Sequence, residues 1–269
     1  IGDLKIDRLC ALADQAEMMV ACENAYNAQA LSRAAQVRGV NLGVVIELET
    51  GLRRCGVQDI EQGVTLAREI DGLPGLRFRG IMSHQVIDGE PRPEERISEG
   101  RRAMGGVIDL KDAIEGSGIP VEIVSTGETW SYDVAGDISG VTEIQGGSYL
   151  LMDTHYRYMT EFDYAAKVLT TIISTPRSGV AIGDAGVRAI STIRGLPEVS
   201  GRHGVTVVSM DGDHTVFNVS DGYSLKIGDQ LLLIPAQQDA MVSRWDRFVG
   251  LRNGWVEAVW DIQARGCHS

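Results

Sequence analysis

The sequence predicts an α/β protein, in which a parallel (β/α) barrel segment is followed by a C-terminal antiparallel β domain. Two observations lead to this prediction. In about the first 150 residues, short apolar runs alternate with helical patterns, the order typical of a parallel sheet with crossover helices. From residue 165 on, β-branched alternation is interrupted by Asp-Gly and Asn-Gly pairs, which are signals of hairpin turns. We therefore expect one domain over residues 1–160 and a second over residues 161–269.

The composition is typical of a soluble globular protein. Of the 269 residues, 43% are hydrophobic and 23% are charged, and the formal net charge is −12. Such a charge disfavours nucleic acid and anionic membrane surfaces as partners. No apolar run approaches the roughly 20 residues that a membrane span needs. The four cysteines form no Cys-x-x-Cys pair, so we expect reduced thiols and a cytoplasmic protein.

Five βα units are expected in the N-terminal domain. Helical periodicity predicts its helices, and short apolar runs bounded by turn residues predict its strands. The expected helices are residues 3–15, 24–36, 60–70, 93–113 and 132–135, and the expected strands are residues 18–21, 42–48, 76–82, 121–124 and 141–144.

The even spacing of these units favours a barrel over a doubly wound sheet, because no dinucleotide-binding glycine fingerprint accompanies them. A complete eight-stranded barrel needs about 250 residues, so five units form an incomplete barrel. We expect the remaining units to precede Ile1, since the pattern changes after residue 160.

The C-terminal domain is expected to be an antiparallel β structure. Its clearest strands are residues 168–173, 205–208, 215–219 and 231–234. The Asn253-Gly254 pair predicts a closing hairpin, with strands over residues 248–252 and 255–260.

Two expected strands end in small residues and hydroxyls, at residues 125–129 and 145–149. Glycine lets a ligand approach the backbone closely, and clustered amides and hydroxyls at a strand end suit an anionic oxygen such as a phosphate. The same pattern also fits two βα turns that need glycine only for their geometry. The pattern alone favours neither the phosphate site nor the structural turns.

Other candidate groups follow the expected strands. The carboxyl ends of parallel barrel strands carry catalytic groups, and Arg54 and His84 lie there. Arg54 can give a fixed cation and His84 can act as an acid or base, although a surface arginine and a packed histidine are the structural alternatives. In the β domain Asp239 can ligate a hard metal ion, but one carboxylate does not make a site.

The blocks around these residues resemble those of the D-threonine aldolase / D-serine dehydratase-like family, which are pyridoxal-phosphate (PLP) enzymes of fold type III whose barrel is shared with alanine racemase. The resemblance covers essentially the whole chain and rests on four blocks in the family's order. Residues 125–129 stand where the family has Ser-Gly-Gly-Gly-Thr, and residues 143–149 match its Glu-Ile-Gln-x-Gly-Ser-Tyr. Residues 184–198 and 256–266 supply the third and fourth blocks.

The resemblance implies a PLP cofactor, a small amino-acid substrate and a homodimer. It also implies that Arg54 faces the pyridine ring of the cofactor or its phenolic oxygen. The residues implied to hold PLP through its phosphate are Ser125, Gly127, Thr129, Gly147, Ser148 and Tyr149.

The chain departs from the family pattern at the cofactor's attachment point. The family's Schiff-base lysine lies in an Arg-Pro-His-x-Lys segment on an early barrel strand, and covalent catalysis through an imine needs that amine. The lysines of this chain are Lys5, Lys111, Lys167 and Lys226, and none has that context. We therefore expect the chain to lack the N-terminal part of the barrel.

Two further departures concern the metal and the substrate side of the pocket. Metal-dependent members carry Pro-Gly-His-x-Asp or Pro-Gly-His-x-Cys, but Gln237 stands here at the histidine position and only Asp239 remains. An amide oxygen is a weaker ligand than imidazole for a transition metal, which weakens the case for a divalent metal. Where members often have Gly-Tyr-x-Gly-His, residues 83–86 are Ser-His-Gln-Val, so His84 takes the aromatic position as a candidate catalytic residue.

Together with the resemblance, these features predict a PLP-dependent lyase acting on a β-hydroxy-D-amino acid. The reaction is either retro-aldol cleavage to glycine and an aldehyde, or elimination as in D-serine dehydratase. Without the histidine ligand, metal-assisted elimination is the less favoured route. The alternatives are an amino-acid racemase of the same fold and a non-catalytic protein that keeps the fold.

Overall fold

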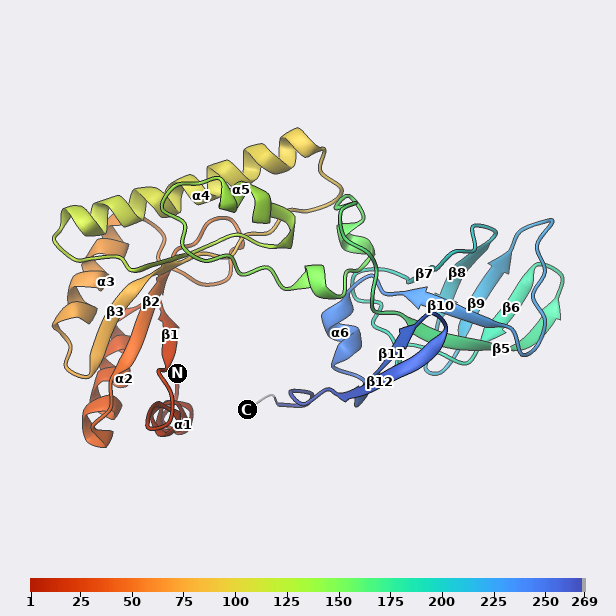
Figure 1. The fold of residues 1–269 in the computed structure, drawn as a ribbon, viewed down its shortest axis with the longest axis horizontal. Coiled ribbons are helices and arrows are strands. Elements are labelled where there is room, and N and C mark those ends of the chain that lie inside the picture. The colour runs from red at the N-terminus through yellow and green to blue at the C-terminus, as the bar shows by residue number, and fades with distance from the viewer. Residues whose placement is uncertain (268–269) are drawn as a thin grey trace. The chain divides into compact units, whose positions relative to one another are not determined.

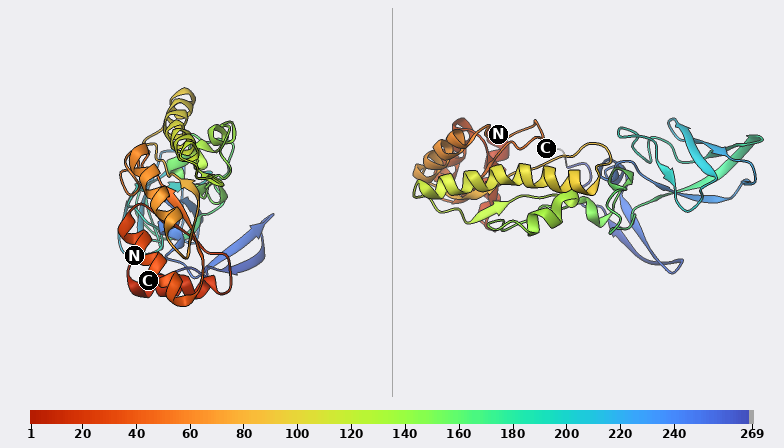
Figure 2. Two further views of the ribbon diagram at one scale, coloured as in Figure 1. Left: turned by 90° about the vertical axis from the view of Figure 1, so that its left-hand side faces the viewer. Right: turned by 90° about the horizontal axis from the view of Figure 1, so that it is seen from above.

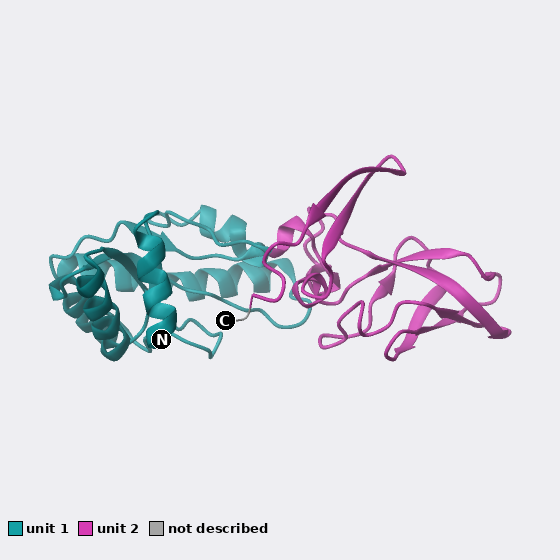
Figure 3. Ribbon diagram, turned by 90° about the horizontal axis from the view of Figure 1, so that it is seen from below, with its two compact units in different colours: residues 1–147 teal, residues 148–269 magenta. Residues whose placement is uncertain are grey.

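A computed structural model describes residues 1–267, and the chain divides into two compact units, residues 1–147 and residues 148–269 (Figure 3). Unit 1 contains a parallel sheet with helices, and unit 2 contains antiparallel sheets (Figure 1). Both classes agree with the sequence prediction. No helix within residues 1–267 has the length and apolar character needed to cross a membrane.

Unit 1 follows the predicted order of strands and helices. Its helices are α1 (Asp3–Ala13), α2 (Ala25–Arg38), α3 (Ile60–Gly72), α4 (Pro93–Gly116), the short 3₁₀ helix η1 (Thr129–Ser131) and α5 (Tyr132–Gly136). Its strands are β1 (Met19–Cys22), β2 (Leu42–Glu47), β3 (Leu76–Met82) and β4 (Ile123–Ser125).

Local sequence signals set the ends of these helices. The Asn24 side chain accepts a hydrogen bond from the Asn27 backbone N–H at 2.9 Å and caps α2 at its start. Gly39 ends the same helix in the left-handed region, with φ of 74°. The Asp59 side chain caps α3 in the same way, through the Gln62 backbone N–H at 2.8 Å.

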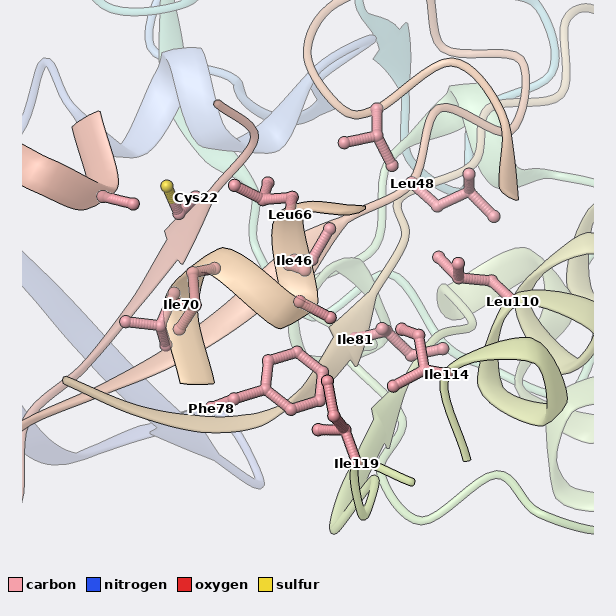
Figure 4. Close-up of a cluster of buried hydrophobic side chains, with 14 of the residues drawn as sticks. Cys22, Ile46, Leu48, Leu66, Ile70, Phe78, Ile81, Leu110, Ile114 and Ile119 are labelled. Atoms are coloured by element: carbon pink, nitrogen blue, oxygen red, sulfur yellow. The ribbon is translucent and has the colours of Figure 1, made fainter. Parts of the chain in front are cut away.

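The four strands of unit 1 form one parallel sheet in the order β1-β2-β3-β4. Helices α3 and α4 pack on each other and on this sheet, and α4 runs as one long helix beside it (Figures 1 and 2). Apolar side chains from both layers meet in the core, among them Ile46 and Ile81 from the strands and Ile70 and Leu110 from the helices (Figure 4). Burial of this shared face holds the sheet and helices together.

The strand expected over residues 141–144 is wrong as a full strand. This segment forms only an isolated parallel bridge, between Ser125 and Glu143. The Thr142 hydroxyl accepts a hydrogen bond from the Val124 backbone N–H at 2.8 Å, while the backbone N–H groups of Thr142 and Glu143 both donate to the Val124 carbonyl. A side chain therefore replaces one bond of the backbone ladder, and the segment runs along β4 without becoming a fifth strand.

Unit 2 begins with two 3₁₀ helices, η2 (Ser148–Leu150) and η3 (Thr154–Tyr156). A six-stranded sheet has the order β7-β10-β5-β6-β9-β8, and a separate hairpin, β11-β12, extends away from it (Figures 2 and 3). The strands are β5 (Val168–Arg177), β6 (Val180–Gly183), β7 (Glu198–Val199), β8 (Val205–Met210), β9 (Thr215–Val219), β10 (Gln230–Ile234), β11 (Arg247–Arg252) and β12 (Trp255–Asp261), with helix α6 (Gln238–Val242) between β10 and β11.

Candidate active site in unit 1

Three loops leave the carboxyl edge of the unit 1 sheet, after β2, β3 and β4. Parallel strands direct these ends to one edge, which is where barrel enzymes place their active sites. The loops carry Arg54, His84 and residues 125–129, so the structure brings these predicted candidates to the same edge of the sheet.

Gln85 joins all three loops. The residue is only 3% exposed, and its amide nitrogen lies within hydrogen-bond distance of three hydroxyls, those of Thr126 at 2.8 Å, of Thr50 at 3.4 Å and of Ser83. Its amide oxygen accepts from the Gly127 backbone N–H at 3.3 Å. A buried amide with both ends bonded fixes the groups around it, because breaking any of these bonds leaves a polar atom without a partner.

The backbone N–H groups of the loop after β4 are used within unit 1. The Thr126 N–H donates to the Glu143 carbonyl at 3.0 Å, and the Glu128 N–H donates to the Ser131 hydroxyl at 3.0 Å. With the Gly127 N–H bound to Gln85, three successive amides of this loop have internal acceptors. This loop therefore has a fixed shape, and its backbone donors already have acceptors.

Gly127 is required by the shape of this loop. Its φ of 93° lies in the region that side-chain-bearing residues rarely adopt, and a Cβ there would lie 2.7 Å from the Cβ of Ala135. Gly127 thus brings the loop against α5 and lets the chain turn.

The second glycine-bearing segment, residues 145–149, is attached to the first. The Gln145 side-chain amide donates to the Ser125 hydroxyl at 2.5 Å, and the Gln145 backbone N–H donates to the Gly127 carbonyl at 3.3 Å. Ser125 in turn donates to the Glu143 carboxylate at 2.5 Å. The Ser125 hydroxyl therefore connects the two segments.

The turn that follows has open donors. The backbone N–H groups of Gly147 and Ser148 make no hydrogen bond within residues 1–267, and a Cβ on Gly147 would meet nothing within 4 Å. The Ser148 carbonyl accepts from the Met152 N–H at 2.8 Å, which curls the chain so that successive amides lie at the start of η2. Unpaired amides with open space suit an anionic oxygen. This turn thus fits a phosphate better than the loop after β4 does.

Arg54 lies in a loop shaped by Glu49. The Glu49 carboxylate accepts hydrogen bonds from the backbone N–H groups of Gly51 and Arg54, the second at 3.2 Å. The Arg54 guanidinium is 3.4 Å from the Glu47 carboxylate, and its side chain is 55% exposed. Glu47, at the end of β2, therefore anchors the Arg54 side chain, and most N–H donors of the guanidinium remain accessible.

His84 contacts a buried carboxylate. Its Nδ1 atom contacts Oε1 of Glu128, whose side chain is 11% exposed, while the imidazole is 35% exposed. The sequence prediction singled out His84 and gave Glu128 no role.

Helix α4 packs against η1 and α5, the two short helices that follow β4. The Arg96 guanidinium makes two hydrogen bonds of 2.6 Å to the Asp133 carboxylate and one of 2.7 Å to the Trp130 carbonyl. Hydrogen bonding to Arg96 lowers the pKa of Asp133. Trp130 itself is 2% exposed, so η1 is held against α4 directly after Thr129.

The loops after β2, β3 and β4 of unit 1 contain no lysine. Lys5 and Lys111 are on helices α1 and α4, where Lys111 pairs with Glu115, and Lys167 and Lys226 belong to unit 2. None of these four amines follows a strand of the parallel sheet.

In unit 2, a buried carboxylate fixes the segment that carries Gln237 and Asp239. Asp153 is 3% exposed, and its two oxygens accept hydrogen bonds from the backbone N–H groups of His155 and Gln238, each at 3.0 Å. The Thr154 N–H also donates to the Pro235 carbonyl at 3.0 Å. Burial raises the pKa of Asp153, against the opposing effect of its two hydrogen bonds.

The donors at Gln237 and Asp239 do not fit a transition-metal site. Asp239 already accepts a hydrogen bond from the Ala240 backbone N–H at 2.6 Å, and Gln237 offers an amide in place of imidazole. Within residues 1–267 no three histidine, cysteine or acidic side chains cluster as metal ligands would.

Sequence reasoning missed Gln85, Glu128 and Asp153 as organising residues. Gln85 lies three positions after β3, and its partners Thr126 and Gly127 are about forty residues away, so no local pattern signals them. For Glu128 a signal was present, because a charged residue within a glycine-bearing loop is unusual unless it has a partner.

Comparison with known proteins identifies relatives along the whole chain. Residues 5–155 match the family described as alanine racemase, N-terminal domain, and residues 165–251 match the family described as putative serine dehydratase domain. The 3-hydroxy-D-aspartate aldolase of Paracoccus denitrificans (strain Pd 1222) is 35% identical over 274 residues, which cover 97% of this chain and 70% of that protein. The D-threonine aldolase of an Arthrobacter species is 32% identical over 276 residues, covering 99% of this chain and 72% of that protein.

A solved structure agrees with these matches. The crystal structure of D-threonine aldolase from Filomicrobium marinum superposes with a TM-score of 0.96 at 29% sequence identity, covering 100% of this chain and 76% of that one. The similarity extends through the parallel sheet and the antiparallel domain.

Proposed function

Because this chain belongs to the D-threonine aldolase / D-serine dehydratase-like family with an alanine racemase-type N-terminal domain, we propose that its protein is a PLP-dependent lyase that cleaves a β-hydroxy-D-amino acid into glycine and an aldehyde. The observation that carries this proposal is the match of 97% of the chain to an aldolase for a substrate of this class. A second aldolase, for D-threonine, matches over 99% of the chain.

The residues present fit a bound PLP phosphate. The open amides of Gly147 and Ser148 would hold its oxygens, together with the hydroxyls of Ser148 and Tyr149. Gly127 gives the loop after β4 its turn, and Tyr149, whose ring is 5.9 Å from that of Phe162, would complete the turn. PLP supplies an electron sink for the bond that breaks next to the amino group.

Arg54 and His84 are proposed to act on the ring and the substrate. The accessible guanidinium of Arg54 would orient the cofactor through its ring nitrogen or phenolic oxygen. His84, partly exposed at the same sheet edge, would accept the proton of the substrate's β-hydroxyl.

Cleavage is favoured over elimination by the donors of the segment after β10. Expulsion of a β-hydroxyl is helped by a metal ion on the leaving oxygen. Gln237 and Asp239 do not fit such an ion, whereas retro-aldol cleavage needs only a base for the hydroxyl proton.

The test is a product assay on the purified holoprotein with D-threonine and 3-hydroxy-D-aspartate. Cleavage predicts equal amounts of glycine and aldehyde, and chelation of divalent metals is expected to leave the rate unchanged. Formation of a keto acid and ammonia would identify a dehydratase, and formation of the L-enantiomer a racemase. No turnover of either substrate would contradict the proposed function.

The cofactor site is tested by the double substitution Ser148→Ala with Tyr149→Phe. Loss of charge-assisted contacts to the phosphate is expected to weaken PLP binding about 10–100-fold, followed by the visible absorbance of the bound cofactor. The exposed tyrosine Tyr223 supplies a matched control, and Tyr223→Phe is expected to leave PLP affinity unchanged. Unchanged affinity in the double variant would return the turn to a structural role.

We also propose that the protein is a homodimer. Hairpin β11-β12 supports this, because Val249, Val259 and Trp260 are each more than half exposed on it. Exposed apolar side chains gathered on one element favour a covering partner.

A further inference from the structure

We propose that Glu128 is a positioning residue that holds His84 as the acceptor of the substrate's hydroxyl proton. This role rests on the proposed lyase function, because it concerns the base of that reaction. It gives a second role to a buried carboxylate that also forms a capping box with Ser131 at the start of η1.

Glu128 is a buried carboxylate, and one of its two oxygens has no hydrogen bond. The residue is 8% exposed, and its Oε1 atom makes no hydrogen bond within residues 1–267. The polar group that this oxygen contacts is Nδ1 of His84. A buried carboxylate needs a positive or donating neighbour, so the pair is the arrangement that makes its burial tolerable.

The backbone on both sides of the pair is fixed. Ser83 donates its backbone N–H to the Ser125 carbonyl at 3.0 Å, and its hydroxyl is 2.8 Å from that of Thr126. The Gln85 amide bonds to Thr126 and Gly127 on the other side of His84. His84 is thus the more exposed residue between two buried anchors, and only its side chain retains freedom to rotate.

The contact with Glu128 restricts the rotation of the His84 imidazole. A carboxylate beside Nδ1 favours the tautomer with the proton on Nδ1, and leaves the Nε2 lone pair free to accept a proton. The Glu128 backbone is itself anchored, through its N–H to the Ser131 hydroxyl at 3.0 Å. Its carboxylate can therefore orient the imidazole without moving.

The contact between the two partners is made by the fold. His84 and Glu128 are separated by 43 other residues in the chain, and yet their side chains touch.

The proton and electrons of the step balance without another reactant. The hydroxyl O–H bond breaks and its proton moves to Nε2 of His84, while the oxygen lone pair forms the carbonyl bond of the aldehyde. The electron pair of the broken Cα–Cβ bond stays on Cα, which takes up one proton to become glycine, and Nε2 of His84 gives up the proton that it accepted. One proton is thus accepted and one released by His84 in each cycle, and the proton count is unchanged.

The kinetic test uses Glu128→Gln and His84→Gln in the holoprotein with D-threonine. His84→Gln is expected to lower kcat by about 10²–10⁴-fold, the usual contribution of a general base. Glu128→Gln is expected to lower kcat by about 10–100-fold with KM nearly unchanged, as for groups that orient a catalytic residue. Glu128→Asp, which keeps a carboxylate, should recover part of the rate.

His214 offers a matched control. It also lies beside a carboxylate, with Nδ1 3.7 Å from Asp211, but in an exposed turn of unit 2. His214→Gln is expected to leave kcat unchanged.

A spectroscopic test reads the imidazole without turnover. In protein labelled with ¹⁵N, the nitrogen shifts and couplings of His84, assigned by their loss in His84→Gln, should show a proton on Nδ1 and none on Nε2. Glu128→Gln should shift this resonance pattern towards the Nε2–H tautomer.

The outcomes separate the two proposals. A wild-type holoprotein without lyase activity contradicts the proposed function and the proton-acceptor role with it. An active wild type in which Glu128→Gln changes neither kcat nor the His84 resonances overturns the role of Glu128 alone. A wild-type His84 with its proton on Nε2 overturns it as well.

Discussion

Gly127 shows how one residue determines the loop after β4. Because its φ of 93° is combined with a Cβ position 2.7 Å from Ala135, any side chain there must move α5 or the loop. Gly127→Ala is therefore expected to destabilise the protein by roughly 1–3 kcal/mol and to weaken PLP binding. Urea unfolding followed by circular dichroism, and cofactor absorbance, measure the two effects.

Gly105 provides the control for this substitution. It lies within helix α4, where a Cβ would meet nothing within 4 Å. Gly105→Ala is expected to stabilise the protein by about 0.5–1 kcal/mol, because alanine loses less backbone entropy in a helix. A Gly127→Ala variant as stable as Gly105→Ala would show that the loop tolerates a side chain.

Asp153 predicts a pH dependence at the residue scale. Its pKa is raised by burial, so its contribution to stability is fully present below the unfolded pKa and is lost as the pH rises through the folded pKa. In Asp153→Asn the amide cannot accept from both backbone N–H groups, and we expect a loss of about 1–3 kcal/mol. The difference in unfolding free energy between wild type and variant should shrink as the pH rises above the usual range of an aspartate. A difference that grows with pH would contradict the raised pKa.

At the scale of elements, Arg96 attaches α4 to η1 and α5. Its bonds to Asp133 and to the Trp130 carbonyl hold the segment that follows the candidate cofactor loop. Arg96→Ala is expected to cost roughly 1 kcal/mol, a modest figure because the Asp133 side chain is 40% exposed and its ion pair is screened.

The pH behaviour of this variant has the opposite sign to that of Asp153. The pKa of Asp133 is lowered by Arg96, so the stability it contributes is present above the unfolded pKa and lost as the pH falls through the folded pKa. Wild type and Arg96→Ala should therefore converge in acid-range unfolding curves. Arg102→Ala, which removes an exposed pair with Glu99 on the same helix, is the control and should unfold as wild type.

Elements were predictable where a local pattern encoded them. Residues 42–48 and 93–113 were correctly assigned because burial on both faces and a long apolar stripe are visible in the sequence, and the observed β2 and α4 follow them closely. Strand β7 has only two residues, Glu198–Val199, and so carries no periodicity. The segment at Thr142 failed as a strand because its hydroxyl bonds to the backbone of β4, which depends on the neighbour that it meets.

The sequence predicted individual residues of the candidate site, but not the hydrogen bonds that connect them. Composition and order indicated the glycine-bearing segments, Arg54 and His84. The bonds of Gln85 to Thr126 and Gly127 join residues more than forty positions apart, and only the parallel register of β3 and β4 brings them together. The same register places Glu128 beside His84.

At the scale of the whole molecule, the proposed homodimer predicts a concentration-dependent assembly. Val249 and Val259 are register partners on hairpin β11-β12 and are 58% and 55% exposed. Burial of a valine contributes about 1.5 kcal/mol, so replacing both by serine should weaken self-association on the order of 100-fold. Sedimentation velocity over a range of concentrations measures this change.

Ile193 is the control for the hairpin. It is 79% exposed elsewhere in unit 2, and Ile193→Ser is expected to leave association unchanged. A wild type that sediments as a monomer at all accessible concentrations would contradict the dimer.

The burial of Trp130 has a practical consequence, because the tryptophans are divided unequally between the two units. Unit 1 holds only Trp130, at 2% exposure, whereas Trp245, Trp255 and Trp260 of unit 2 are 41%, 80% and 56% exposed. A soluble quencher such as iodide will therefore silence the emission of unit 2 first and leave a shorter-wavelength signal from one indole. That indole lies directly after Thr129, and its N–H points to the Gln85 carbonyl at 3.5 Å. The remaining fluorescence is an intrinsic optical reporter of the loops that are proposed to receive the cofactor.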